Sequence, residues 1–288
     1  MNQPSSDKTV ESEYSLLASR RQVLSAASKG LFAGLAGGAL LPTGANARPT
    51  SESLSTTEIL MKLMASTVNE AVPWYYSGRI YAVLAGATEP VPLFNFEGSE
   101  IYWVSVKGAQ NWDIASSTLT FYRDLDDNSF LDDFKNPLTG KMNTVVPNVL
   151  RTRPGAGANY SDKGLAMFGQ TLPLDSAPVN AQITNNGPVT WLQYTQTFSA
   201  LPQPFLRSNS MMGPSSEVWD PEVTSVESQF AETTLSTWHH WLEMGAIQGH
   251  LVWHAVGRKL KNLDELPVDY HSRAREFSSV HFRNPNDE

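Results

Sequence analysis

The sequence predicts a mainly β protein whose antiparallel sheet is strongly curved or closed into a barrel. From Trp74 onward, short runs of alternating residues recur between Gly, Pro, Asn and Asp residues, which is typical of strands joined by hairpins. Apolar residues make up 41% and charged residues 17% of the 288 residues, so the chain can build a folded core. A sheet of many strands must protect its edges, and closure around a cavity is the common solution. We therefore expect a calycin-like β-barrel.

The first residues of the sequence have the pattern of an export signal. Paired Arg20 and Arg21 precede a mildly apolar stretch, 26–41, which Lys29 and several glycines interrupt. A small-x-small cleavage site follows at 45–47. This pattern resembles a twin-arginine signal peptide, and such a signal implies a periplasmic protein that meets the twin-arginine translocase as a folded chain.

The leader also fixes the expected domain organisation. We expect a signal peptide over residues 1–47 and a single β-barrel-like domain over residues 48–288. The alternative reading of the leader is a membrane anchor, but a bilayer requires about 20 apolar residues in a row. We therefore expect no stable membrane insertion.

One helix is expected before the strands. Ser55 and Glu58 have the spacing of a capping box, and the apolar residues after them recur at helical spacing as far as Val68. The helix should end near Pro73, because proline cannot continue it.

The expected strands alternate in polarity and are bounded by turn residues; they are 79–84, 91–96, 100–106, 118–123, 130–134, 143–149, 188–198, 222–230, 233–238 and 249–257. Residues 124–128 match the first three ligand positions of a calcium loop. However, Ser129 and Lys135 replace the glycine and the glutamate that such a loop needs, so a hairpin turn is expected. The segment 151–188 carries several glycines and prolines, and we expect a long irregular insertion there, a loop or lid.

Charge and composition exclude several classes of function. The net charge of -8, with no cluster of Lys and Arg, disfavours nucleic-acid binding. The absence of cysteine excludes disulfides, thiolate zinc sites, iron–sulfur clusters and a Cys nucleophile. The sequence also lacks the nucleophile elbow, the phosphate-binding loop and the dinucleotide fingerprint. We therefore expect a protein that uses no cofactor.

All six histidines lie after residue 238. His250 and His254 have the i, i+4 spacing that could hold a metal on a helix, but the flanking glycines favour a strand, in which they lie roughly 13 Å apart. We therefore expect no metal site. Instead we expect His254, or failing that His250, to transfer a proton inside the barrel, the alternative being a hydrogen-bonded histidine of the core or rim. Catalysis requires Leu251 and Trp253, on the opposite face of the strand, to point outward.

Further candidates lie on the early strands. Tyr122 and Asp124 are expected to assist the histidine in catalysis. An arginine is costly to bury unpaired, so Arg79 or Arg123 could bind a carboxylate or phenolate; the alternative is a salt bridge at the barrel end. The remaining expected substrate-binding residues could line the cavity: Tyr81, Trp103, Trp191, Trp238 and His239.

Several longer motifs resemble a known family. They are Tyr76–Tyr81, Glu89–Phe94, Phe134–Gly140, Trp241–Gly245, Gly257–Lys259 and Leu263–Pro267. Together they are similar to the family called domain of unknown function 1838, whose members commonly carry twin-arginine signals. The resemblance implies one exported domain over roughly residues 58–285, and it implies no catalytic residues.

Two hypotheses on function follow from these residues. The first is an exported, cofactor-independent enzyme, a lyase or isomerase that uses acid–base chemistry on an aromatic or apolar small molecule. The second is a barrel that binds such a molecule without catalysis. They differ in whether a histidine and a carboxylate converge on one cavity.

Overall fold

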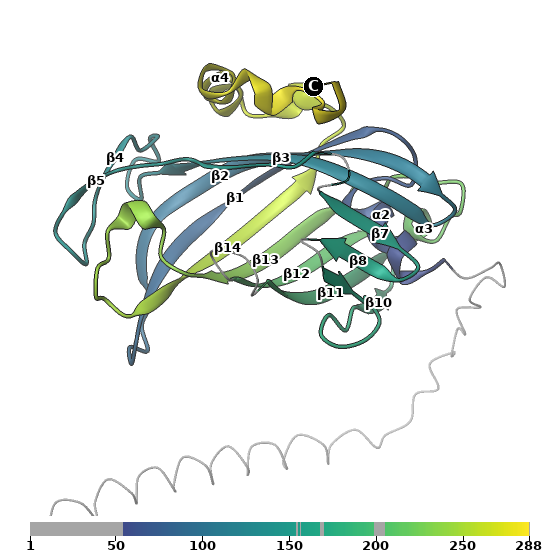
Figure 1. Cartoon of the computed structure of the whole chain (residues 1–288), viewed down its shortest axis with the longest axis horizontal. Coiled ribbons are helices and arrows are strands. Elements are labelled where there is room, and N and C mark those ends of the chain that lie inside the picture. Colours follow the sequence, from purple (N-terminus) through teal and green to yellow (C-terminus); the bar gives the residue numbers. More distant parts are fainter. Residues whose placement is uncertain (1–53, 154, 156, 168–169, 199–204, 288) are drawn as a thin grey trace, which may run out of the picture. The chain divides into compact units, whose positions relative to one another are not determined.

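Within the described residues, twelve strands form one antiparallel sheet that curls around a helix, and β4 and β5 form a separate hairpin (Figure 1). The structure is a computed structural model that describes residues 54–287 apart from 154, 156, 168–169 and 199–204. The predicted signal peptide, including Arg20 and Arg21, lies outside these residues. The strand order is β10-β11-β12-β13-β14-β1-β2-β3-β7-β8-β9. Strand β7 pairs with the first part of β3, and β6 pairs with a later part of the same strand. The prediction of a mainly β protein with a strongly curved antiparallel sheet is confirmed.

The strands are long in the centre of the sheet and short at its edges. Their bounds are β1 (Ala71–Leu84), β2 (Val91–Gly108), β3 (Asn111–Arg123), β4 (Asp133–Lys135), β5 (Met142–Thr144), β6 (Asn148–Arg151), β7 (Ala158–Ser161), β8 (Gly164–Met167), β9 (Gln170–Leu172), β10 (Gln182–Asn186), β11 (Val189–Phe198), β12 (Phe205–Pro214), β13 (Gln229–Ser236) and β14 (Gly249–Lys259). The helices are α2 (Thr56–Met64), α3 (Ser215–Val218), α4 (Val268–Phe277), η1 (His240–Leu242), η2 (Leu263–Glu265), η3 (Ser279–Phe282) and η4 (Pro285–Asp287). No helix in the described part of the chain is both long enough and apolar enough to span a bilayer.

Helix α2 begins as its capping box predicts. The Ser55 hydroxyl accepts a hydrogen bond from the Glu58 amide at 3.2 Å, which satisfies one of the free donors of the first turn. The helix ends at Met64, earlier than expected, and Val68 is exposed outside it.

The C-terminal end of α2 is fastened to the sheet by side chains that donate to its last carbonyl groups. The Lys259 ammonium donates to Lys62 O and Ala65 O, each at 2.8 Å, and to the Ser225 hydroxyl. The Trp74 indole donates to Met64 O at 2.7 Å. Because these carbonyls have no partner within the helix, the sheet supplies the hydrogen bonds that water would otherwise make.

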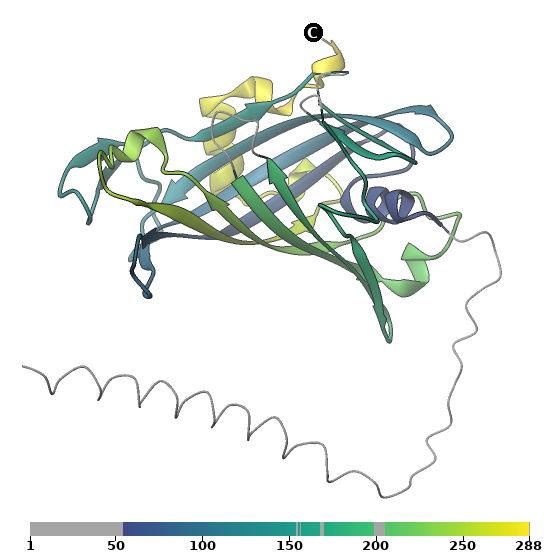
Figure 2. The ribbon, with the colours of Figure 1, turned by 60° about the horizontal axis from the view of Figure 1, so that its bottom comes forward.

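Two apolar clusters lie on the concave face of the sheet. The first surrounds α2 and joins β2 and β3 to β11 and β12, which are far apart in strand order, so the sheet must curl around the helix. Figure 2 shows α2 within this curl. The second cluster lies at the opposite end, where η1 and the β4–β5 hairpin pack on residues of β1, β2 and β14.

The convex face of β1, β2 and β3 is covered by the C-terminal residues (Figure 1). Tyr270 of α4 is fully buried there; its hydroxyl accepts from the Ser99 amide and donates to Leu119 O, each at 2.8 Å. Both ring nitrogens of buried His281 lie within 2.8 Å of hydroxyls, those of Ser99 and Ser117. Burial, with a smaller effect of Arg151, lowers the pKa of His281 to about 4, so this ring is neutral at pH 7.

Several elements differ from those that the sequence predicts. The expected strands 91–96 and 100–106 are one strand, β2, because the space beside Gly98 is filled by the Tyr76 ring rather than by a turn. The expected irregular insertion 151–188 contains β7, β8, β9 and β10. Strand β12 and helix α4 were not predicted, and the strand expected at 222–230 begins only at Gln229.

Replacing Lys259 tests how far the sheet depends on this fastening of α2. We expect Lys259→Met to lower the free energy of unfolding by about 2 kcal/mol, because three hydrogen bonds from a buried ammonium are lost. Urea unfolding followed by tryptophan fluorescence measures the change. The matched control is Lys261→Met, at an exposed position just after β14, which should change the free energy by less than about 0.5 kcal/mol. Equal stability of the two variants would contradict the assignment.

Candidate functional site

The centre of the concave face carries an arginine that is only partly paired. Arg207 of β12 lies 3.2 Å from the Glu232 carboxylate of β13 through its Nε, and its side chain is 39% exposed. The structure gives its two Nη nitrogens no hydrogen-bond partner among the described residues. Desolvation opposes the charge, but the carboxylates of Glu232 and Glu100 raise the pKa of Arg207, so the guanidinium stays charged.

The Glu232 carboxylate is held in place by its neighbours. The Asn209 amide donates to its Oε2 at 3.2 Å, and the Thr234 hydroxyl donates to its Oε1 at 2.8 Å. Because alternate residues of a strand share a face, Arg207 and Asn209 of β12 and Glu232 and Thr234 of β13 all point to the concave side. These contacts fix the position of the Glu232 carboxylate. The two Nη nitrogens of Arg207 are therefore the donors that a ligand could use.

A second carboxyl group, that of Glu100 on β2, faces the same region. It accepts hydrogen bonds from the Thr118 hydroxyl at 3.1 Å and from Tyr102. Burial raises its pKa, while Arg207 and these hydrogen bonds act in the opposite direction. Burial likewise raises the pKa values of Tyr102 and Tyr194, so these phenols are neutral donors at pH 7.

Between the two apolar clusters, the floor of the concave face is made of aromatic rings that lie over glycines. Phe96 lies over Gly78, Tyr76 over Gly98 and Phe230 over Gly257, and a Cβ atom at any of these glycines would come within 3.0 Å of the ring. These rings could not lie against the backbone if the glycines were larger residues. The result is an aromatic surface next to the charged pair.

The aromatic end of the concave face holds a tyrosine–histidine pair. The hydroxyl of Tyr122, on β3, lies 3.2 Å from Nε2 of His239, which precedes η1. The His239 ring stacks on Trp241 at 5.7 Å and 10° between planes, and it meets the Trp253 ring edge to face at 5.2 Å. Burial, with a smaller effect of His240, lowers the pKa of His239 to about 4, and burial raises the pKa of Tyr122. At pH 7 both groups are neutral, which suits hydrogen bonding or proton transfer.

The residues that carry the family resemblance hold this end together. Asn136, which is 1% exposed, donates to Leu242 O at 2.9 Å and accepts from the Leu138 amide at 2.9 Å. Lys141 pairs with Glu243 at 3.0 Å. The β4–β5 hairpin is thereby fastened to the loop that places His239.

The expected catalytic histidines do not face the concave side, so this prediction is wrong. Leu251 and Ala255 of β14 belong to the buried cluster at the aromatic end, and Trp253 packs against it. His250 and His254 lie on the opposite face of the strand, and His254 is exposed. The physical reason is the two-residue period of a strand, which lets only one of these sets face inward.

Three other expected site residues also lie away from the concave face. Asp124 holds the hairpin turn, since its Oδ1 accepts from the amides of Asp126 and Asp127. Trp103 is 6% exposed and packs in a convex cluster with Leu263 and Phe282. Trp191 pairs with Met212 on the convex side of β11, because its neighbours Leu192 and Tyr194 face the core.

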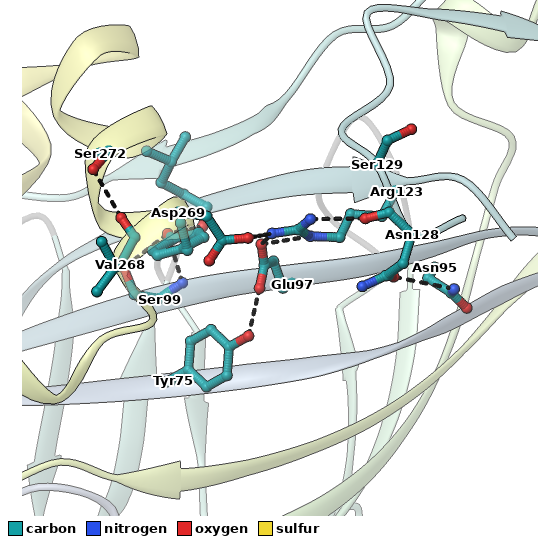
Figure 3. A network of polar contacts seen from close by, with 12 residues as sticks. Tyr75, Asn95, Glu97, Ser99, Arg123, Asn128, Ser129, Val268, Asp269 and Ser272 are labelled. Atoms are coloured by element: carbon teal, nitrogen blue, oxygen red, sulfur yellow. Dashed lines mark hydrogen bonds and ion pairs between the residues drawn. The ribbon is translucent and has the colours of Figure 1, made fainter. Parts of the chain in front are cut away.

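Of the expected residues, two groups are brought together. Tyr122, His239 and Trp238 share the aromatic end of the concave face, where the Trp238 indole donates to Ile247 O at 3.0 Å. Arg79 and Tyr81 instead meet His254 on the convex face. Arg123 is paired as the sequence suggested, but with Glu97 and Asp269 rather than with an acid of its own turn (Figure 3). The described residues contain no group of three or more His, Asp or Glu side chains that could hold a metal ion.

The charged pair at the centre was missed because β12 was not predicted. Arg207 and Asn209 alternate with serines in the sequence, which is a strand pattern with polar residues on both faces. On β13, Glu232 and Thr234 share the face of Phe230. The sequence did offer one signal for this site: a charged residue, Glu232, falls on the same face of its strand as the apolar Phe230.

The protein is a half-barrel: a curled antiparallel sheet whose concave face is aromatic and partly charged. The chain belongs to the family described as protein of unknown function (DUF1838), which matches residues 69–286. No curated protein matches it. One similar solved structure is Rv2717c from M. tuberculosis, with 11% sequence identity over 65% of this chain and 91% of that chain. Its TM-score of 0.16 is too low to support a structural argument.

Proposed function

We propose that the protein binds a small aromatic or apolar molecule with one acidic or carbonyl group on the concave face of its sheet. The observation that carries this proposal is Arg207. Its side chain is 39% exposed, its Nε pairs with Glu232, and its Nη nitrogens have no hydrogen-bond partner among the described residues, next to aromatic rings. A guanidinium offers two parallel donors, which match the two oxygens of a carboxylate. The partly buried rings of Phe230 and Trp253 would contact the rest of the ligand.

The surrounding groups favour an acid with a single charge. Arg207 already has one carboxylate partner, and the Glu100 carboxyl group faces the same region, so a ligand with several negative charges would be repelled. Neutral Tyr102 and Tyr194 add donors but no charge. Small-molecule sites commonly combine apolar walls with a few such polar groups.

A pair of matched probes tests the role of Arg207. We expect 1-anilinonaphthalene-8-sulfonate, an aromatic anion, to bind saturably, and Arg207→Gln to weaken its binding by about tenfold or more, the loss typical of a hydrogen bond to a charged group. Binding of N-phenyl-1-naphthylamine, which has the same rings without the sulfonate, should change by less than about threefold. Probe fluorescence measures both affinities.

The control for this test is Lys135→Gln, an exposed cation of β4, which should leave both affinities unchanged. Urea unfolding confirms that each variant is folded. Equal binding of the anionic probe to wild type and Arg207→Gln would contradict the proposal.

A second candidate function is acid–base catalysis on such a ligand, and the Tyr122–His239 pair favours it. When His239 Nε2 donates to the Tyr122 hydroxyl, Nδ1 is an acceptor, and no described residue occupies it. Nδ1 could then take a proton from a carbon next to a carbonyl group, while the Tyr122 hydroxyl donates to the oxygen that gains the negative charge. Return of the proton to another carbon would complete an isomerisation, and loss of a leaving group would make the reaction a lyase step.

Hydrogen exchange separates catalysis from binding alone. In D2O we expect the protein to accelerate exchange of the α-protons of phenylpyruvate, an aryl keto acid, above the buffer rate measured by NMR. His239→Gln should reduce this acceleration by roughly a hundredfold, the usual loss for a general base. His240→Gln, at the exposed neighbouring position, should not change it. Exchange at the buffer rate, with probe binding intact, would overturn catalysis and leave the binding function standing.

We also propose that the chain is exported to the periplasm by a twin-arginine signal over residues 1–47. The support is the sequence of the leader, with Arg20 and Arg21 before a weakly apolar stretch.

Substitution of the arginine pair tests this export. Arg20→Lys with Arg21→Lys should reduce the periplasmic protein at least tenfold in fractionated cells, because the translocase reads the arginine pair itself. A single Lys8→Arg substitution upstream serves as the control and should export normally. Undiminished periplasmic protein in the double variant would contradict the proposal.

A further inference from the structure

The convex face of the sheet carries a groove that the proposed function does not use. Two hollows, of about 660 and 500 Å³, adjoin at His254, which lines both. The first is lined by two full rows of convex side chains from four strands: Gln193, Thr195, Ser208, Ser210, Ala231, Thr233, His254 and Val256. The second continues across β1 and β2 to the turn that contains Asn128. The groove therefore crosses six strands, roughly 24 Å at the usual strand spacing.

Two basic side chains lie in the middle of this groove. His254 of β14 is directly opposite Arg79 of β1, and both are exposed. The Arg79 Nε donates to Asn95 Oδ1 at 2.8 Å, and the structure gives Arg79 no ion pair among the described residues. The Asn95 amide in turn donates to Asp124 O at 3.2 Å, so the orientation of the guanidinium is fixed.

The carboxylate that lines the hollow beside Arg79 already has other partners. Glu97 lines the same hollow, but it is 5% exposed and accepts hydrogen bonds from Tyr75 and from Arg123 Nε at 2.6 Å (Figure 3). Asp269 is bound to Arg123 as well. Within the described part of the chain, the Arg79 guanidinium therefore keeps a positive charge without an ion pair beside the His254 ring, and an anion between the two side chains would be stabilising.

The rest of the groove presents hydroxyl and amide groups rather than apolar pockets. Thr195, Ser208 and Thr233 continue the row of His254 across three strands, and the Tyr81 ring lies 5.6 Å from the His254 ring. An extended peptide would gain its main-chain hydrogen bonds at a free strand edge. This groove crosses strands whose backbone groups already pair with one another, so it offers no such edge.

We propose that this groove binds an acidic sugar chain, with a carboxylate of the sugar between Arg79 and His254 and a sugar ring against Tyr81. Sugar hydroxyls match the hydroxyl and amide side chains, and an open groove suits a ligand longer than the groove itself. The site lies on the face opposite Arg207, so it is independent of the proposed small-molecule site.

Calorimetric titration of the folded protein with hexagalacturonate tests the site. We expect saturable binding that Arg79→Gln and His254→Gln each weaken by about tenfold. Lys135→Gln, at an exposed cation outside the groove, should change the affinity less than twofold. The neutral chain maltohexaose should bind at least tenfold more weakly than hexagalacturonate.

Two further titrations make the test specific. If inorganic sulfate or hexaglutamate binds as tightly as hexagalacturonate, the site recognises anions and not sugars, and the proposal is overturned. An equal loss of affinity in Lys135→Gln would also overturn it, because general charge attraction would then explain the binding. Loss of aromatic-probe binding in Arg207→Gln bears only on the concave site, so the two proposals can fail separately.

Discussion

The end of helix α2 is held by hydrogen bonds from the sheet, and this attachment determines how the sheet curls. A helix end that is buried must find partners for its last carbonyl groups, and here the sheet supplies them through Lys259, Trp74 and Ser228. These donors come from β1, from β14 and from the segment before β13, while the apolar side of the helix packs on β2, β3, β11 and β12. One short helix thus holds both sides of the sheet, and the curl of the sheet follows from it.

The curl brings together groups that a flat sheet would keep apart. Glu100 lies on β2 and Arg207 on β12, with three strands between them in the sheet order, yet each affects the pKa of the other. The closure of the other end depends on the fastening of the β4–β5 hairpin to the η1 loop by Asn136. With both ends filled by apolar clusters, Arg207, Glu232 and Glu100 lie in the middle of the concave face.

Three arginines of the sheet show how pairing separates structural from binding roles. Arg123 donates to Glu97, Asn128 O and Asp269 and packs 3.8 Å from the centre of the Phe130 ring, so its role is to join α4 to the convex face (Figure 3). Arg79 is anchored by the hydrogen bond from its Nε to Asn95, and Arg207 forms an ion pair in which its Nε lies 3.2 Å from the Glu232 carboxylate. A side chain that is already oriented loses little conformational entropy when a ligand binds to its free donors. For this reason we propose Arg207 and Arg79, and not Arg123, as ligand-binding residues.

Local chemistry dictates several elements, and these were predictable from the sequence. The Ser55 capping box, the hairpin turn after Arg123, the strand from Gly249 and the mainly β curved sheet could all be read from short patterns, because each depends on neighbouring residues. The alternation of β14 also showed that His250 and His254 share one face. However, the alternating pattern does not show which of the two faces is buried. That depends on what Leu251 packs against.

The composition of the two candidate sites depends on contacts that form only in the folded chain. Tyr122 and His239 are 117 residues apart in sequence, and the loop that brings them together is held by Asn136 from a third segment. Gly98 was expected to interrupt a strand, but Tyr76 from the neighbouring strand fills its space and keeps the strand continuous. These contacts join residues distant in sequence, and no local pattern encodes them because each residue's role depends on which strand the curled sheet places beside it.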